Sequence, residues 1–324
     1  MSGPFYILSI DGGGFRGLFA AHILRRIEEE WQVDWRDQFG LLAGTSTGSI
    51  LTAGLACGLS ARRLAEFYDA YGEEIFSPRL RSRLDVFNLF TSRYAKARLQ
   101  ARLEETFGGI TLGEVSVPLI LPAVDIGNGC VHVFKSNFHN SFVRDQTVRV
   151  SDAVLASCAA PTYFDPHNVQ VYQVVDGGLW ANNPSLVAAI DAHYRLEIPL
   201  ENIRLLSVGT GTSRSFYPRS EGKWRDRLIR SWQGWGVATR WQRSKLLDLI
   251  LNLQSANAHN MLCLLLRESP LDSQRVLRLT FESDRPLPMD STRMRGNWVA
   301  SADHAFTHNA ARIATFLSTA GATK

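Results

Sequence analysis

The chain has 324 residues, of which 45% are hydrophobic and 20% are charged. This ordinary globular composition excludes a disordered chain, a coiled coil and a collagen-like repeat. The 35 basic residues exceed the 31 acidic ones by a net charge of only +4, which gives no reason to expect a DNA- or RNA-binding protein. The four cysteines form no CxxC pair, so no zinc or redox motif is present, and a chain this long needs no metal or disulfide to fold.

Two kinds of apolar segment alternate along the chain. Short runs typical of buried parallel strands are Phe5–Ile10, Gly40–Ala43, Pro118–Ile126, Val131–Phe134, Gln173–Val175 and Ile203–Val208. Helical periodicity occurs in Gly17–Trp31, Gly48–Cys57, Ala61–Phe76, Arg93–Phe107, Ser151–Ala159, Pro184–Leu196, Trp235–Leu266 and Ala300–Leu317. This alternation predicts an α/β fold with a mostly parallel central sheet and helices on both faces.

The sequence indicates neither a signal peptide nor a membrane-spanning helix. The N-terminus has no basic region and only a short apolar run, unlike a signal peptide. The stretch Gly40–Ala61 carries no charge, but it is too polar and too rich in glycine for a spanning helix. We therefore expect a cytoplasmic protein with reduced thiols.

Two basic segments depart from the strand–helix pattern. Residues 77–102 contain seven basic residues against Asp85, and residues 214–245 contain nine against Glu221 and Asp226. The second segment also holds four tryptophans, Trp224, Trp232, Trp235 and Trp241. Such segments form either a solvated helical face with inward tryptophans or a surface for anionic lipid, a phosphorylated ligand or a partner.

A glycine-rich loop follows the first strand. The motif Asp11–Gly17 reads Asp-Gly-Gly-Gly-Phe-Arg-Gly and opens a helix. Glycines leave backbone N–H groups unobstructed, and the helix N-terminus adds its positive dipole, so the loop suits an anion. Alone, the motif does not distinguish a phosphate, as in the dinucleotide fingerprint, from the oxyanion of an acyl-transfer intermediate.

The second strand leads into Gly44-Thr45-Ser46-Thr47-Gly48, which matches the G-x-S-x-G nucleophile elbow. The required context is a strand, a sharp turn and a helix, and the sequence predicts all three here. Ser46 is therefore the candidate nucleophile, with Gly44 and Gly48 relieving the crowding of the turn.

A third motif, Asp176-Gly177-Gly178, follows a strand and precedes Asn182-Asn183-Pro184. An acid at the carboxyl end of a strand lies where α/β folds collect their active residues. Taken alone, Asp176 is better interpreted as the aspartate of an Asx turn that leads into a glycine turn.

Together these motifs resemble the patatin-like phospholipase family. The resemblance runs from about residue 5 to residue 215 and includes Ala156–Pro161 and the strand end Ser207–Gly211. It implies a three-layer patatin-like fold and a single domain over 1–324, with a core at 5–215. Residues 216–324 show no shared motif, and we expect them to be helical.

The resemblance also implies a Ser-Asp dyad without histidine. Ser46 would form an acyl-enzyme, and Asp176 would accept its proton and later activate water. The N–H groups of Gly12, Gly13 and Gly14, with Thr47, would bind the oxyanion, and Arg16, Gly44, Gly48 and Gly177 would support the motifs. No cofactor or metal is required.

Three alternatives remain open. A Ser-Asp-His triad is available in chain order through His259, His304 or His308, and the last two are spaced as a helical metal pair. A nucleotide-binding oxidoreductase would need an acid after the second strand, where the elbow lies instead. A non-catalytic binding module would show no esterase activity.

The resemblance extends to biological role. The expected substrate is an acyl ester of a membrane phospholipid, met peripherally at the inner face of the membrane. The chain is similar to stand-alone bacterial patatin-like effectors of anti-phage signalling (CBASS). This implies a cyclic oligonucleotide activator, an arginine-lined phosphate pocket and homo-oligomer formation on activation. The alternative is a constitutive hydrolase of lipid metabolism.

Overall fold

We describe a computed structural model of the chain, covering residues 3–79, 91–214, 243–285 and 287–321. An eight-stranded sheet has the strand order β5-β6-β3-β2-β1-β7-β9, and β4 pairs with β3. The strands are β1 (Phe5–Ile10), β2 (Leu41–Gly44), β3 (Leu119–Asp125), β4 (Cys130–Lys135), β5 (His167–Val169), β6 (Tyr172–Asp176), β7 (Ile203–Val208) and β9 (Val276–Leu279). β8 (Thr212–Ser213) and β10 (Glu282–Ser283) form a separate parallel pair.

The sheet is parallel through its centre and antiparallel at one side. β1 lies between β2 and β7, parallel to both, and β2 pairs in parallel with β3. Beyond β3, the pairs β3–β4, β3–β6 and β5–β6 are antiparallel. The prediction of a mostly parallel sheet is therefore confirmed, and the parallel strands bring their carboxyl ends to one edge.

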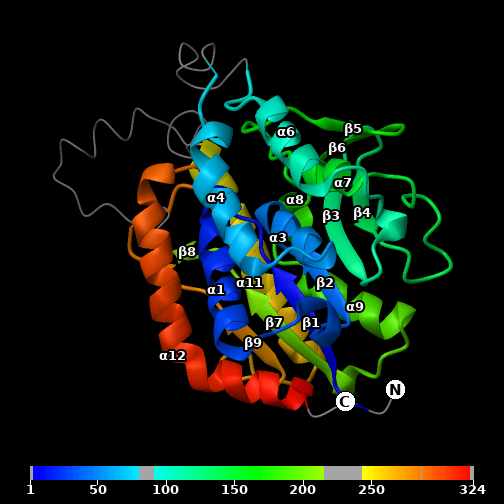
Figure 1. Ribbon diagram of the computed structural model, residues 1–324, viewed down its shortest axis with the longest axis vertical. Helices are drawn as coiled ribbons and strands as arrows, with labels where there is room; N and C mark the ends of the chain where they lie inside the picture. The colour runs from blue at the N-terminus through cyan, green and yellow to red at the C-terminus, as the bar shows by residue number, and fades with distance from the viewer. Residues whose placement is uncertain (1–2, 80–90, 215–242, 286, 322–324) are drawn as a thin grey trace, which may run out of the picture.

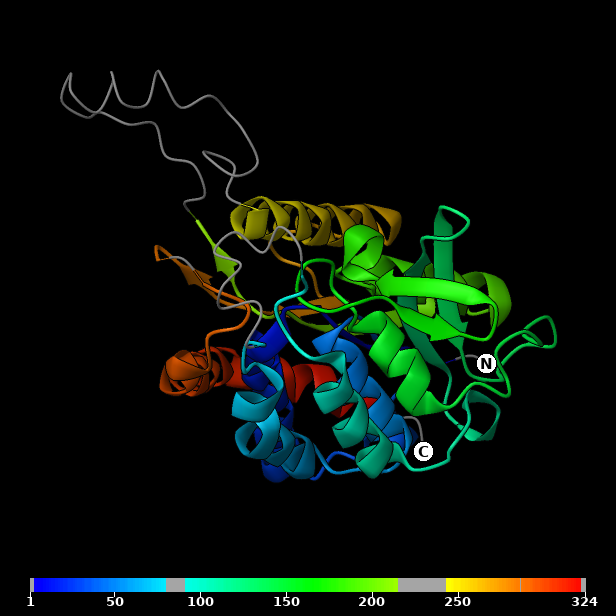
Figure 2. The same ribbon diagram turned by 90° about the horizontal axis from the view of Figure 1, so that it is seen from above.

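Helices cover both faces and make three layers (Figures 1 and 2). They are α1 (Gly17–Trp31), α2 (Trp35–Gln38), α3 (Thr47–Ala56), α4 (Ala61–Ile75), α6 (Lys96–Phe107), α7 (Val150–Ser157), α8 (Gly178–Ala181), α9 (Ser185–Arg195), α11 (Arg243–Leu265) and α12 (Arg295–Gly321). α1, α3, α4, α6, α7 and α12 contribute to one apolar core, and α9 packs on the opposite face. α11 contributes to both, through Leu251 on the first side and Leu262 on the second.

Local sequence explains how these layers form. α9 places three fully buried alanines, Ala188, Ala189 and Ala192, against the sheet, so the helix backbone approaches the strands closely. At the start of α4, Ser60 acts as the predicted N-cap, because its hydroxyl accepts the Arg63 N–H at 3.2 Å.

The C-terminal third differs from expectation. We expected only helices beyond residue 215, but β9 extends the sheet by pairing with β7. β9 has four residues with Arg278 among them, so its pattern is too short to indicate a strand. Residues 215–242, with all four tryptophans of the basic segment, and residues 80–90 lie outside the described part, so the proposed surface over 214–245 is not tested.

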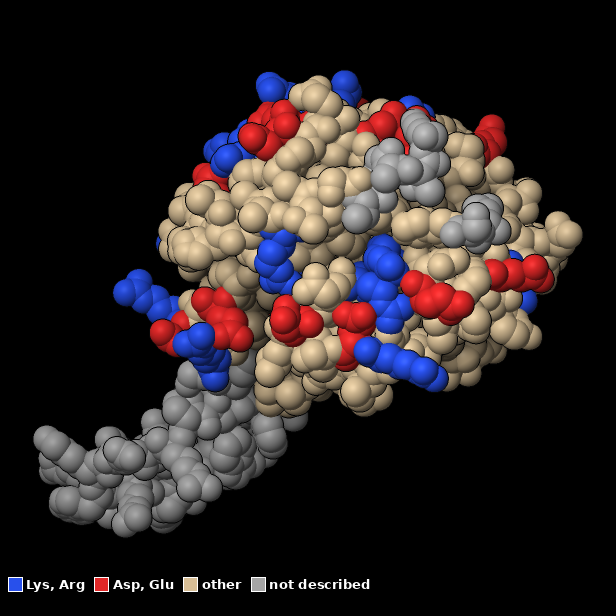
Figure 3. Space-filling view, turned by 90° about the horizontal axis from the view of Figure 1, so that it is seen from below, with Lys and Arg blue, Asp and Glu red and all other residues tan. Residues whose placement is uncertain are grey.

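The start of β1 and the C-terminal end of α12 lie at one end of the molecule (Figure 1). Seen from below, this end carries basic and acidic side chains interspersed, with no extended patch of one sign (Figure 3). Within the described ranges, no helix is long and apolar enough to cross a membrane.

Candidate active site

The elbow places Ser46 in a strained conformation between β2 and α3. Ser46 has φ 53° and ψ −124°, outside the regions that L-residues favour. A Cβ on Gly44 would lie 2.2 Å from the Gly48 carbonyl oxygen, and a Cβ on Gly48 would lie 2.3 Å from the carbonyl oxygen of Ile10. The predicted strand, turn and helix are all present, and only glycine fits at the two flanking positions.

The elbow is anchored from two neighbouring elements. The Ser46 N–H donates to Ser157 Oγ at 3.0 Å, and Ser157 Oγ donates in turn to the carbonyl oxygen of Pro122 at 2.7 Å. Ser157 comes from α7 and Pro122 from β3. These bonds fix the turn, and they also occupy the Ser46 N–H, which is therefore not a donor to a ligand.

Asp176 ends β6 and is buried beside Ser46. Its Oδ1 accepts the Gly178 N–H at 2.7 Å, and its own N–H donates to the carbonyl oxygen of Ala159 at 3.1 Å. Burial raises the pKa of the Asp176 carboxyl from 3.8 to about 6, although hydrogen bonds from the Ser46 side chain and the Gly178 N–H oppose the shift. A Cβ on Gly177 would lie 2.2 Å from the Pro122 carbonyl oxygen, so this turn also requires glycine.

The glycine loop contributes Gly13 and Gly14 to the same pocket, but not Gly12. The Gly12 N–H donates to the Asn182 carbonyl oxygen at 2.9 Å, so the expectation that it faces a ligand is wrong for this structure. Among the described residues, none accepts a hydrogen bond from the N–H of Gly13 or Gly14. Thr47, the first residue of α3, also lines the pocket, and an N–H at that position has no intrahelical partner.

Two arginines fix the loop from outside the pocket. The buried Arg16 side chain donates from Nε to the Gly13 carbonyl oxygen at 3.3 Å and from Nη1 to the Leu287 carbonyl oxygen at 3.1 Å. Arg278 on β9 binds Asp11 through two hydrogen bonds of 2.8 and 2.5 Å. The sequence analysis named Arg16 but not Arg278. The only sequence feature that indicated a cationic partner was the carboxylate of Asp11 at the start of the loop.

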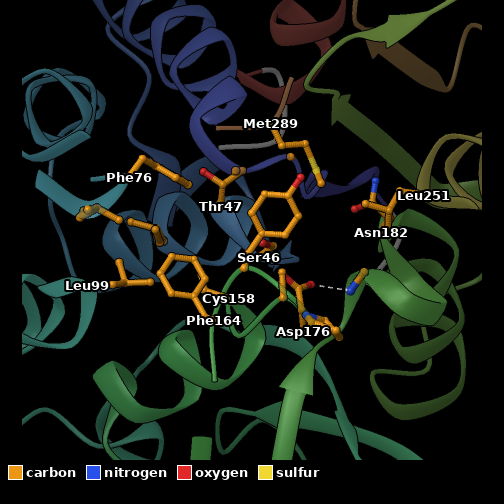
Figure 4. A pocket seen from close by; sticks show the side chains of 18 of the residues that line it. Ser46, Thr47, Phe76, Leu99, Cys158, Phe164, Asp176, Asn182, Leu251 and Met289 are labelled. Atoms are coloured by element: carbon orange, nitrogen blue, oxygen red, sulfur yellow. Dashed lines mark hydrogen bonds between the residues drawn. The ribbon is translucent and has the colours of Figure 1, made fainter. Parts of the chain in front are cut away.

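The pocket itself is mostly apolar. The cavity is narrow, with a volume of about 70 Å³. Ser46 and Asp176 lie close together within it, and Phe76, Leu99 and Phe164 lie on the side away from Leu251 (Figure 4). Such a lining suits a hydrocarbon chain whose polar end meets Ser46.

The histidine alternatives are not supported by this geometry. All eight histidines are among the described residues, and none lines the pocket. His259 interacts with the Pro270 carbonyl oxygen at 3.2 Å, and the His304 and His308 rings stack on each other on α12. Over the described ranges, no group of three or more His, Cys, Asp or Glu side chains is placed to hold a metal.

The basic segment 77–102 is partly visible. Arg79 pairs with Asp165 at 2.7 Å, Lys96 donates to the Pro166 carbonyl oxygen at 2.6 Å, and Arg102 pairs with Glu74 at 3.1 Å. These three side chains are thus bonded to carboxylate or carbonyl groups of the protein itself.

An α/β fold with a serine on a strand–helix elbow, beside a buried acid in an apolar pocket, is the architecture of a serine acyl hydrolase. The family model described as patatin-like phospholipase matches residues 8–189. A cGAMP-activated phospholipase of Escherichia coli is 33% identical over 289 residues, covering 82% of this chain and 76% of that protein. The chain belongs to the patatin-like phospholipase family and is a carboxylic ester hydrolase.

Two further relatives are also nucleotide-activated. A cGAMP-activated phospholipase of Vibrio cholerae serotype O1 is 34% identical over 289 residues, covering 81% of this chain and 77% of that protein. A cUMP-AMP-activated phospholipase of Escherichia coli is 28% identical over 294 residues, covering 86% of this chain and 82% of that protein. The expected likeness to nucleotide-activated bacterial phospholipases is therefore confirmed.

Proposed function

We propose that this protein hydrolyses acyl esters of membrane phospholipids through a Ser46–Asp176 dyad, and that a cyclic oligonucleotide activates it in antiviral defence. The observation that carries the chemistry is the pairing of an elbow serine with a buried acid, whose pKa is about 6, in one apolar pocket. A pKa just below neutral leaves the carboxylate ionised at neutral pH yet basic enough to accept a proton.

In the first half of the reaction, Ser46 Oγ attacks the ester carbonyl carbon. Asp176 accepts the hydroxyl proton, and the carbonyl oxygen becomes the oxyanion of a tetrahedral intermediate. When the intermediate collapses, the carbon–oxygen bond to the glycerol breaks. Asp176 returns the proton to the departing alcohol, and the lysophospholipid leaves an acyl-Ser46 ester behind.

In the second half, water takes the place of the alcohol. Asp176 removes one proton from the water as its oxygen attacks the acyl carbon. The second intermediate collapses with return of the proton to Ser46 Oγ, releasing a fatty acid. One carboxylate thus serves both steps, and the mechanism needs no histidine.

The oxyanion donors that we propose are the N–H groups of Gly13 and Gly14, with the N–H of Thr47. All three residues line the pocket. Among the described residues, no other group accepts a hydrogen bond from the N–H of either glycine. Gly12 is left out because Asn182 already accepts its N–H. Arg16 would act indirectly, by holding the Gly13 carbonyl and so the direction of the next peptide N–H.

The relatives support the nucleotide activator that we propose. Two of them are activated by cGAMP and one by cUMP-AMP, which supports a cyclic dinucleotide activator here. We place the action at the inner face of the cell membrane and expect activation to change the oligomeric state. The constitutive lipid hydrolase remains the competing function.

The test is hydrolysis of a fluorogenic phospholipid with and without a panel of cyclic di- and trinucleotides, with Ser46→Ala as the control. Activity that requires one nucleotide and is absent from Ser46→Ala supports both parts of the proposal. Activity without any nucleotide, still lost in Ser46→Ala, retains the hydrolase and rejects the activation. No activity in any condition rejects both.

A further inference from the structure

The outer face of α11 carries a row of exposed apolar side chains. Ile250 is 44% exposed, Leu253 62%, Met261 45%, Leu264 61% and Leu265 39%. Their spacing places them along one side of the helix, over roughly 22 Å at 1.5 Å per residue. The chain has no charged residue from Leu249 to Leu266. We call these five residues the apolar stripe.

The stripe lies on the helix that borders the acyl pocket. Leu247 and Leu251, on the inner side of α11, line the pocket that contains Ser46. Leu179 on α8 lines the same pocket and is itself 38% exposed. The pocket therefore has a partly exposed apolar residue on α8, a helix that contacts α11.

α11 is held firmly in this position. Gln254 Oε1 accepts the Asn182 N–H at 2.6 Å, and Asn182 Nδ2 donates to Ser255 Oγ at 2.8 Å. Farther along, Leu262 and Leu266 are buried against the sheet. The inner side of the helix is thus buried, while its outer side carries the apolar stripe together with the exposed Ala256, Asn257 and Asn260. α11 itself lies at the outer edge of the molecule (Figure 2).

We propose that the apolar stripe of α11 docks on the surface of a phospholipid bilayer and sets the mouth of the acyl pocket against it. This rests on the proposed function, in which the substrate is a membrane phospholipid. Within the described residues no helix can span a bilayer, so α11 would lie in the plane of the interface, as amphipathic helices do. Arg267, exposed just beyond the stripe, is placed to reach the headgroups.

The position of the stripe on a helix that lines the acyl pocket favours a bilayer over a second protein molecule. An acyl chain that leaves the bilayer beside Leu179 moves from hydrocarbon to the apolar pocket without crossing water, which would cost about 0.8 kcal/mol for each CH₂ exposed. A second copy of the chain seated on the stripe would cover this route.

The experiment compares the full chain with the double variant Leu253→Gln/Leu264→Gln. Both leucines are more than half exposed, and glutamine keeps their size and helix propensity. The matched control is Val143→Gln/Val171→Gln, which changes two exposed apolar residues of 79% and 89% exposure outside α11. Binding is measured by co-sedimentation with vesicles of phosphatidylethanolamine and phosphatidylglycerol. Activity is measured as hydrolysis of the vesicle lipid and, separately, of a short-chain soluble ester. All assays contain cGAMP and cUMP-AMP.

We expect the α11 variant to lose roughly tenfold in vesicle binding and vesicle hydrolysis, and to hydrolyse the soluble ester as the unmodified chain does. Equal vesicle binding by the α11 variant and the unmodified chain would overturn the docking proposal, as would an equal loss in the control. A change in oligomeric state without loss of vesicle binding would assign the stripe to a second copy instead. Failure of every protein on the soluble ester would reject the hydrolase mechanism, whereas co-sedimentation still decides the docking.

Discussion

Replacing Asp176 by asparagine should abolish hydrolysis and make the folded protein more stable at neutral pH. Asparagine has nearly the shape of aspartate, and its Oδ1 can still accept the Gly178 N–H that Asp176 accepts at 2.7 Å. It has no carboxylate to take the Ser46 proton. By analogy with other hydrolases that lose their base, we expect activity to fall on the order of 10³- to 10⁴-fold.

The gain in stability follows from the pKa of the carboxyl. Its pKa is about 6 in the folded protein and 3.8 in the unfolded chain, so the folded state holds the proton more tightly. The stability contributed by protonated Asp176 is complete below the unfolded pKa and is lost as the pH rises through the folded pKa. Relative to uncharged asparagine, ionised Asp176 should therefore cost about 3 kcal/mol at about pH 8, and about 1 kcal/mol at about pH 4.5.

The assay is chemical denaturation of the wild type and Asp176→Asn at both pH values, with Ser46→Ala as the control that removes activity without removing the charge. The difference between the two proteins should shrink by about 2 kcal/mol on acidification. Because asparagine does not titrate, this pH dependence belongs to the carboxyl alone. A gain that does not change with pH, or a loss of stability at about pH 8, would refute the burial argument. Near-native activity in Asp176→Asn would remove Asp176 from the mechanism.

Three further outcomes are expected. The kcat/KM for a soluble ester should fall about tenfold per pH unit below about pH 6 and level off above it, and a plateau reaching pH 4 would contradict the assigned base. Arg16→Lys keeps the charge but loses the bond to the Gly13 carbonyl, so kcat should fall roughly tenfold with little change in KM, unlike the partly exposed control Arg25→Lys. Gly48→Ala should abolish soluble expression because its Cβ would meet a backbone carbonyl at 2.3 Å, whereas Gly109→Ala, with nothing within 4 Å, should not.

The parts of the site predicted from sequence are those whose local chain geometry restricts the residue type. The elbow needs glycine before and after Ser46 because backbone atoms lie within 2.4 Å of both Cβ positions. β1 and α1 begin and end at the predicted residues, because the apolar run and the helical period change sharply at the glycine loop. For Gly44 the constraint is local, because the atom that its Cβ would meet belongs to Gly48, four positions on. Gly48 is constrained by Ile10 at the end of β1, and the sequence indicates it only as part of the whole elbow motif.

The parts that were missed depend on contacts between distant segments. Whether the Gly12 N–H faces a ligand depends on Asn182, 170 positions away, whose carbonyl accepts it. Arg278 binds Asp11 across 267 positions, and its strand β9 has no periodicity long enough to recognise. No local pattern encodes these pairs, so the sequence identified the loop but not which of its amides is free.

Under the activation that we propose, the contacts around the loop offer a route from a bound ligand to the reacting groups. Arg16 and Asp11 are held by Leu287 and Arg278, and the Phe15 N–H donates to the Met289 carbonyl oxygen at 2.7 Å. All three tethers come from residues 278–289, outside the 8–189 span that the family model matches. A ligand that displaces this region acts on the oxyanion loop directly, while the elbow keeps its own anchors on α7 and β3. Ser46 and the two glycine donors are thus held by separate parts of the chain, whereas Thr47 belongs to the elbow. A displaced loop would therefore leave Ser46 and Thr47 in place and remove the donors of Gly13 and Gly14.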